Sequence, residues 1–301
     1  MKLSRRTLLL LACLALSGKA LVAQQIRLDA GTKLLVPSSA HTDRFTSFLA
    51  VVNLGSQANN ITITARRTNG SIIGSPINPT LNVGGKFRST DILGEMGAQI
   101  GDFGPITIVS NNNQEFCAVS EVTSVQGFAG FFPGVNVQSA WMEGFIPEVI
   151  DTAAFRTNLG LNTIDATPAN VKLTLHDDSG NILGSANVQV PGNGMNQISP
   201  LTSAIPALSG TNAYLLIKSD RPIHAWASKI NNGTNDPSFE IGVAALTSGS
   251  ISQIAPTISD IRNNLLFIGL ALIAPLVLVL RRHRVNPPTG ADQLAWAMET
   301  L

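Results

Sequence analysis

The sequence contains a long internal repeat. When the chain is shifted along itself by 110 residues, 36–75 align with 146–185 without a gap, and ten of the 40 aligned pairs are identical. A period of this length is too long for a solenoid unit and equals the size of a small domain. We therefore predict two tandem domains of one fold, repeat 1 at 34–143 and repeat 2 at 144–250. The identical pairs include Pro37 and Pro147, Phe45 and Phe155, and Gly70 and Gly180.

Within each repeat, apolar residues alternate with polar ones. Residues 171–176 read Val-Lys-Leu-Thr-Leu-His, and 155–162 have the same period of two. Such alternation places every second side chain on one face of a half-buried antiparallel strand. Gly70 and Gly180 lie between two such stretches, where a hairpin turn needs a positive φ. The pattern predicts an all-β fold, with about seven short strands per repeat in an antiparallel β-sandwich of immunoglobulin-like type. A closed barrel is the alternative.

Several segments of repeat 2 resemble a poorly characterised β-rich module of secreted and surface proteins of environmental bacteria. They are 155–161, 171–184, 219–223, 225–228 and 235–239. The resemblance covers most of 144–245 and, more faintly, 34–135. It implies a bacterial envelope protein with a tandem β-sandwich fold, and it brings no activity and no functional residues.

The C-terminal part carries an apolar segment. Residues 265–280 contain no charge, and Arg281, Arg282 and Arg284 follow them. As a helix this segment extends about 24 Å, and arginines at its end can snorkel toward the headgroups, so it can cross a bilayer. A buried core helix is the alternative. In order, we expect a linker at 251–262, a transmembrane helix at 263–280 and a cytoplasmic tail at 281–301. A cleaved sorting signal would look similar, but no Leu-Pro-x-Thr-Gly motif precedes the segment, so we expect a retained anchor.

The N-terminal part has the pattern of an export signal. Basic residues at Lys2, Arg5 and Arg6 precede the apolar stretch 7–16, and small residues follow it. We expect 1–23 to be a cleaved signal peptide. The paired arginines also resemble a twin-arginine signal, but the run of leucines favours the general secretory route. The basic residues after the C-terminal segment then predict a single-pass type I protein of the cell membrane, with its β domains in the periplasm or outside the cell.

Composition and spacing exclude several function classes. The net charge is +1 and 13% of the residues are charged, with no basic stripe for nucleic acid outside the membrane flanks. The four histidines form no pair at metal-ligand spacing, and the acidic turn at 177–181 lacks the ligand pattern of a calcium loop. Cys13 leaves with the signal, so Cys117 is a single thiol in an apolar stretch, where we expect it to be buried. We predict no enzyme activity, no metal and no cofactor.

Two groups of residues remain as candidate binding surfaces. Strand parity places His224 on the same side as Trp226, on a face that we expect to be exposed, so the two rings could form a sugar platform. An exposed Trp226 would favour that platform, and a buried one would exclude it. Phe128, Phe131 and Phe132 lie between glycines. They form either a plug between domains or in a core, or an exposed apolar patch for a partner or the membrane surface.

Together these features predict an exported, membrane-anchored envelope protein with a structural or adhesive role. Its partners would be the membrane and either envelope proteins or a polysaccharide. A carbohydrate-binding surface module is the alternative, and an uncharacterised enzyme is a distant third. We also expect the repeats to fold independently, with 138–144 as a short junction. Four aromatic residues that crowd this junction argue for caution: Phe131, Phe132, Trp141 and Phe145.

Overall fold

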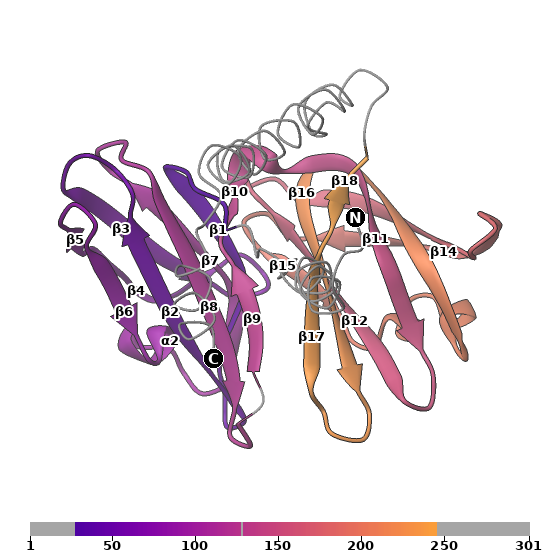
Figure 1. The fold of residues 1–301 in the computed structure, drawn as a ribbon. Coiled ribbons are helices and arrows are strands. Elements are labelled where there is room, and N and C mark those ends of the chain that lie inside the picture. The colour runs from indigo at the N-terminus through magenta and orange to yellow at the C-terminus, as the bar shows by residue number, and fades with distance from the viewer. Residues whose placement is uncertain (1–27, 128, 246–301) are drawn as a thin grey trace, which may run out of the picture. The chain divides into compact units, whose positions relative to one another are not determined.

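The computed structural model describes residues 28–127 and 129–245 (Figure 1). These residues are mainly β-strands, and every pair of neighbouring strands among them is antiparallel. The all-β prediction is therefore confirmed. Helical structure in the described chain is limited to four short turns: α2 (Ile92–Glu95), η1 (Val137–Ser139), η2 (Leu201–Ser203) and η3 (Pro206–Leu208).

Repeat 1 is a sandwich of two sheets. The first has the order β10-β1-β7-β3-β4, and β5 also pairs with β3. The second has the order β6-β2-β8-β9. The bounds are β1 (Lys33–His41), β2 (Phe45–Asn53), β3 (Asn59–Arg66), β4 (Ile72–Ile77), β5 (Thr80–Leu81), β6 (Lys86–Ser89), β7 (Asp102–Ser110), β8 (Phe116–Ser124), β9 (Ala129–Pro133) and β10 (Val135–Asn136).

Repeat 2 has the same plan, except that one long strand belongs to both layers. The first half of β16 pairs with β11 and β13, in the same way as β7 of repeat 1 pairs with β1 and β3. The second half of β16 pairs with β12 and β17. Each repeat has more strands than the seven expected. The additional ones are short edge strands, and a strand of two to five residues is too short to show an alternating pattern in the sequence. The bounds are β11 (Trp141–Asp151), β12 (Phe155–Thr163), β13 (Ala169–His176), β14 (Ile182–Val190), β15 (Met195–Ile198), β16 (Thr211–Asn231), β17 (Pro237–Ile241) and β18 (Val243–Ala244).

The two repeats share local detail as well as strand order. The hydroxyl of Thr42 accepts a hydrogen bond from the N–H of Phe45, and Thr152 does the same for Phe155. Each threonine therefore closes the turn between the first two strands of its repeat. The hairpin glycines Gly70 and Gly180 have φ values of 87° and 83°, as the sequence predicts for equivalent turns.

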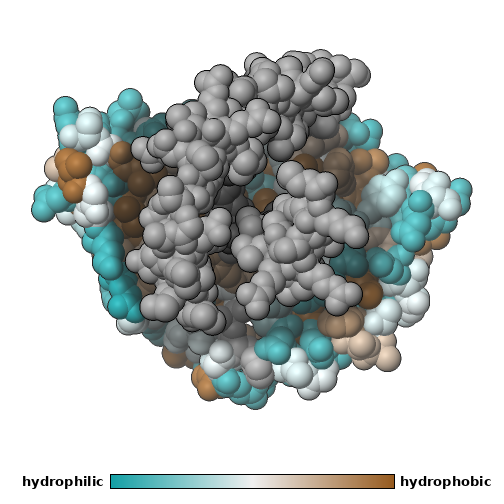
Figure 2. Space-filling model, in the orientation of Figure 1, coloured by the Kyte–Doolittle hydropathy of each residue, from teal (hydrophilic) through white to brown (hydrophobic). Residues whose placement is uncertain are grey.

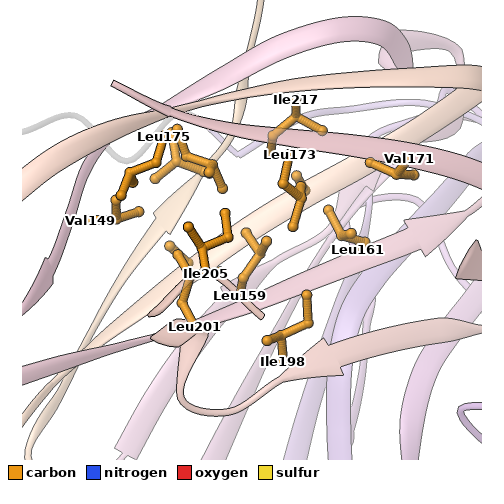
Figure 3. Packing of buried hydrophobic residues seen from close by; sticks show 14 of the residues in the cluster. Val149, Leu159, Leu161, Val171, Leu173, Leu175, Ile198, Leu201, Ile205 and Ile217 are labelled. Atoms are coloured by element: carbon orange, nitrogen blue, oxygen red, sulfur yellow. The ribbon is translucent and has the colours of Figure 1, made fainter. Parts of the chain in front are cut away.

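Each sandwich has its own apolar interior. In repeat 2 the inward residues of both sheets pack together, including Leu159, Leu161, Leu173 and Leu175, all fully buried or nearly so (Figure 3). These leucines are the apolar members of the alternating stretches, and their polar neighbours point away from the core. The period-two pattern therefore decides which side chains form the core.

The strand β11 crosses the predicted boundary between 143 and 144. It begins at Trp141, which pairs with Ile223 and packs in the core of repeat 2. The stretch 138–144 is therefore not simply a short junction, because its second half is already strand. The sequence did not show this because the match between the repeats is readable only from residue 36 onward, after the strand has begun.

Several predicted segments lie outside the described residues. They are the signal peptide at 1–23, the linker at 251–262, the transmembrane helix at 263–280, and the tail at 281–301 with Arg281, Arg282 and Arg284; Phe128 is also outside. Between residues 28 and 245, no described helix has the length and apolar character needed to cross a membrane.

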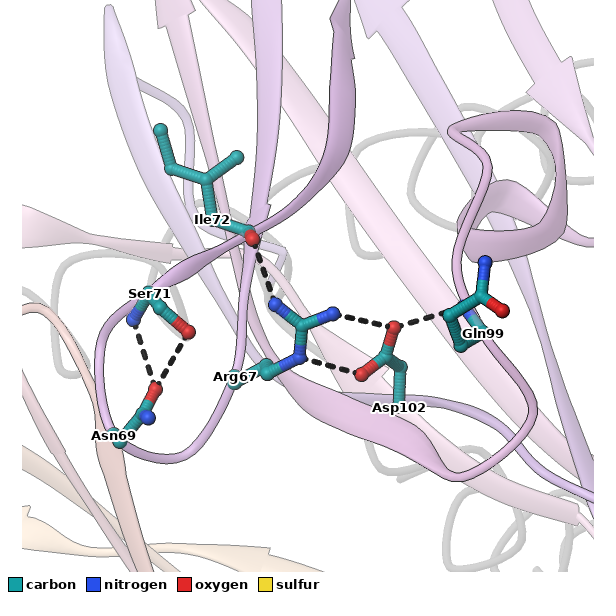
Figure 4. Close-up of polar contacts among 6 residues, drawn as sticks. All are labelled: Arg67, Asn69, Ser71, Ile72, Gln99 and Asp102. Carbon is teal, nitrogen blue, oxygen red and sulfur yellow. Dashed lines mark hydrogen bonds and ion pairs between the residues drawn. The ribbon is translucent and has the colours of Figure 1, made fainter.

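A partly buried ion pair stabilises the turn between β3 and β4. The Nε of Arg67 lies 2.6 Å from Oδ1 of Asp102, and its second nitrogen donates to Oδ2 at 3.0 Å (Figure 4). The N–H of Gln99 also donates to this carboxylate at 2.9 Å. Burial by itself raises the pKa of Asp102, but these hydrogen bonds outweigh it, so the pKa lies below its usual value. The pair fastens the hairpin at 67–71 to the start of β7.

We predict that Arg67→Gln lowers the free energy of unfolding by about 1–3 kcal/mol at pH 7, since hydrogen bonds to a charged partner are lost. Because the folded-state pKa of Asp102 is lowered, its contribution is present above the unfolded pKa of about 4 and is lost as the pH falls through the folded pKa. Urea unfolding at pH 7 and pH 3 measures this. Arg66→Gln is the matched control, since the Arg66 side chain donates to the Gly70 carbonyl and makes no ion pair within the described residues. An equal loss in both variants would contradict a specific role for the pair.

Candidate functional site

Trp226 and His224 do share one face of β16, as strand parity predicts. Their side chains are only 2% and 3% exposed, however, because repeat 1 covers that face. The expectation of an exposed His224 is therefore wrong. Strand parity tells which residues share a face and does not tell what packs against that face. A sugar platform formed by Trp226 and His224 is excluded, since neither ring is accessible.

Trp226 lies in an aromatic cluster that joins the two repeats. Its ring contacts Phe132 of β9 edge-on, with centroids 5.3 Å apart, and it lies 5.8 Å from Phe239 of β17. Phe132 and Phe239 also meet edge to face at 4.4 Å. Together with Met195, Trp226 packs into the core of repeat 1. We call this contact, made by Phe132, Asn162, Met195, Trp226 and Phe239, the joint.

Asn162 supplies the polar part of the joint. Its Nδ2 donates to the carbonyl of Pro37 at 2.9 Å, and its Oδ1 accepts from the indole N–H of Trp226 at 3.1 Å. Asn162 is completely buried, so these bonds satisfy groups that have no access to water. One side chain therefore links β1 of repeat 1 to both Trp226 and its own strand, β12.

Gly160 makes room for the indole ring. It lies opposite Trp226 in the pairing of β12 and β16, and a Cβ at this position would lie 1.9 Å from Cε2 of the ring. Repeat 1 has Ala50 opposite Val119 at the equivalent place. The two repeats therefore differ at this position, with a glycine and a tryptophan in repeat 2 and an alanine and a valine in repeat 1. This difference could have indicated from the sequence that Trp226 has a special environment, but strand parity alone does not use it.

A second contact joins the repeats through their backbones. The N–H of Met195 donates to the carbonyl of Thr68 at 3.0 Å. Glycines on both sides allow this approach: a Cβ on Gly70 would lie 2.1 Å from the oxygen of Gly192, and one on Gly194 would lie 2.3 Å from the oxygen of Thr68. The hairpin at 67–71, which the Arg67–Asp102 pair stabilises, therefore also contacts repeat 2.

The phenylalanines after β8 have separate roles. Phe132 is 7% exposed and belongs to the joint, which agrees with a plug between the repeats. Phe131 lies on the opposite side of β9, where it pairs with Glu121 and is 39% exposed. Phe131 is therefore the one residue of the three that the structure places at a surface, since Phe128 is not described.

Burial of His224 keeps its imidazole neutral near pH 7. Burial lowers the pKa of the ring from 6.5 to about 4, against opposing effects of the Asn136 backbone and of the Asp29 carboxylate. Its Nε2 has no hydrogen-bond partner within the described chain. The buried position therefore favours the neutral imidazole over the charged imidazolium.

The outward face of the layer formed by β14, β13 and the first half of β16 contains an open groove of about 570 Å³. Figure 2 shows mainly hydrophilic and neutral residues on the side where β14 lies. We call this cavity the outer groove. None of its residues was singled out in the sequence, where polar positions on a strand look alike. It is lined by Asn170, Val171, Lys172, Asn187, Val188, Gln189, Lys218, Ser219 and Asp220.

Two further chemical features of the described residues concern metal ligands and the thiol. Within 28–127 and 129–245, no three His, Cys, Asp or Glu side chains come together in a way that could hold a metal ion. Cys117 is half-buried rather than fully buried, and burial raises the pKa of its thiol, so the reactive thiolate is disfavoured.

Comparisons with known proteins find remote similarity. No model of a known protein family matches the sequence, and no curated protein matches it. The crystal structure of the protein designated Thermotoga maritima 1070 has a TM-score of 0.30 at 13% identity, and the match covers 35% of this chain and 96% of that protein. A putative β-galactosidase from Bacteroides fragilis has a TM-score of 0.16 at 10% identity, covering 73% of this chain and 33% of its own. A Pleurotus ostreatus lectin has a TM-score of 0.15 at 10% identity, covering 75% and 82%. Similarities this low carry no argument about function.

We predict that Gly160→Ala lowers the free energy of unfolding by about 1–3 kcal/mol, because the new methyl group forces the indole of Trp226 out of its position. The emission of Trp226 should shift to longer wavelength as the ring becomes more hydrated. Combining the change with Trp226→Val, which copies the pair in repeat 1, should cost less than the sum of the two single changes. Gly233→Ala, in an exposed turn, serves as the control. Additive losses in the double variant would contradict the direct contact.

We also predict an acid-sensitive stability from His224. Its folded-state pKa is lowered, so the unfolded chain binds the proton more readily between about pH 6.5 and 4, and stability falls as the pH drops through this range. His224→Gln should remove up to about 1.4 kcal/mol per pH unit from the slope of unfolding free energy against pH. Asn187→Gln, an exposed position of β14 without a titrating group, is the control and should leave the slope unchanged. Parallel slopes for the wild type and His224→Gln would overturn this assignment.

Proposed function

We propose that this chain is an exported envelope protein, anchored by one transmembrane helix at 263–280, that holds its two repeats as one unit outside the membrane. Its work is structural or adhesive and not catalytic. We take the sandwiches to be of immunoglobulin-like type. The observation that carries the proposal is the joint, in which Trp226 of repeat 2 is buried in the core of repeat 1.

The joint supports a presenting role for a physical reason. Interfaces between domains of one chain are commonly polar and permit relative motion. Here a buried tryptophan, a fully buried asparagine and a backbone hydrogen bond connect the repeats. Contacts of this kind hold two surfaces at a fixed relative position, which suits a protein that displays them to a partner.

A carbohydrate-binding role is the second candidate. The outer groove of repeat 2 is the observation that favours it, in place of the buried Trp226 and His224. Grooves of several hundred cubic ångströms are in the size range of small-ligand sites. An exported location would also place this groove where extracellular polysaccharide is found.

Topology can be tested with protease added to spheroplasts of cells that express the full chain. We expect digestion of the part up to about residue 260. Antibodies against the two ends of the chain should then detect a protected C-terminal fragment and no N-terminal one. Detergent-treated spheroplasts are the control, in which both ends should be lost. Protection of the β region before detergent is added would refute the proposed topology.

A further inference from the structure

We infer that the outer groove of repeat 2 binds a linear polysaccharide that carries carboxylate groups. The inference rests on the exported location given under the proposed function, and it adds the chemical class of the ligand. Three observations on the groove carry it: a pair of opposed lysines, a row of amide side chains, and the lack of both lysines in repeat 1.

The two lysines form a like-charge pair that the described chain neutralises only in part. Lys172 and Lys218 lie directly opposite each other in the pairing of β13 and β16. Like charges at such positions repel, since their Cβ atoms are only about 5 Å apart. Lys218 has Glu143 at 3.0 Å on its other side, whereas Lys172 forms no ion pair within the described chain. A carboxylate placed between the two ammonium groups would accept hydrogen bonds from both.

The nearest acid in the groove is already occupied. Both carboxylate oxygens of Asp220 accept hydrogen bonds from Asn170, one from the backbone N–H and one from Nδ2, each at 2.8 Å. Asp220 is therefore held toward Asn170 rather than toward Lys172. The positive charge of Lys172 remains available to a ligand.

The other polar side chains suit hydroxyl groups. Asn187 pairs with Lys172 across β14 and β13, and Gln189 pairs with Asn170 in the next row. The Asn170 amide donates to Asp220, and Nε2 of Gln189 lies 3.5 Å from Oδ1 of Asn170, whereas Asn187 has no side-chain partner within the described chain. Amides offer a donor and an acceptor side by side, which matches neighbouring sugar hydroxyls.

The shape and lining of the groove favour an acidic sugar chain over other ligands. No aromatic residue lines it, so a neutral sugar would find no ring to stack on. An extended peptide would gain its main-chain hydrogen bonds at a sheet edge such as β14, and the groove lies on a sheet face. An open groove lets a polymer pass through with its ends in solvent.

Repeat 1 provides an internal comparison. Thr62 and Val109 are opposed in the pairing of β3 and β7, at the place where repeat 2 has Lys172 and Lys218. The two repeats keep the fold at this position and differ in charge. A lysine pair is therefore not needed by the sandwich itself.

Calorimetric titration of the full-length protein in detergent tests the inference with three probes: polygalacturonate, its methyl ester and poly-L-glutamate. We expect binding of polygalacturonate that weakens with salt, and at least about tenfold weaker binding of the ester, which keeps the sugar backbone but not the charge. Lys172→Gln and Lys218→Gln should each weaken binding about tenfold. Lys86→Gln, an exposed lysine of repeat 1, is the matched control and should bind like the wild type.

Other results would overturn the inference. Binding that is unchanged by Lys172→Gln would place any site elsewhere, and equal binding of the ester would indicate a neutral glycan ligand. Equally tight binding of poly-L-glutamate would indicate an acidic peptide, and no binding of polygalacturonate would reject the ligand class. Each of these results leaves the membrane topology untouched, because the protease experiment on spheroplasts tests it separately.

Discussion

The burial of one tryptophan determines how the two sandwiches form a unit. Trp226 belongs by sequence to repeat 2, yet its ring packs with Phe132 in the core of repeat 1. Truncation of a buried tryptophan typically costs about 3–5 kcal/mol, a large part of the stability of a small domain. Gly160 leaves space for the ring, and Asn162 satisfies its N–H. Each of these residues would be an unusual choice in a free-standing sandwich.

Much of the fold follows from the sequence. The period-two alternation predicts half-buried strands, the 110-residue repeat predicts a second copy of the same plan, and the hairpin glycines have the positive φ that their turns require. The long strand β16 was harder to predict, because Asp220, Arg221 and Pro222 look like a turn between two strands. In the structure the chain passes through them while one strand crosses from one layer to the other.

The candidate site was less predictable than the fold. Alternation correctly places His224 with Trp226, but the cover over their face includes Phe132 of β9 and Asn136 of β10, which are about 90 residues away in sequence. No local pattern contains that information. The outer groove was missed for the opposite reason: Lys172 and Lys218 are ordinary surface lysines until strand pairing places them opposite each other. The repeat pattern alone predicts that the two repeats fold independently, and the structure does not test that prediction. An isolated repeat 2 would expose the apolar surface of the joint, so for the full chain we expect coupled unfolding instead.

Coupling between the repeats is the central claim, and calorimetric unfolding of the mature protein in detergent tests it most directly. If the joint makes 28–245 one cooperative unit, the β region should unfold in a single transition whose calorimetric and van't Hoff enthalpies agree. Two separate transitions, each with the enthalpy expected for about 100 residues, would show that the repeats unfold independently and would contradict the account.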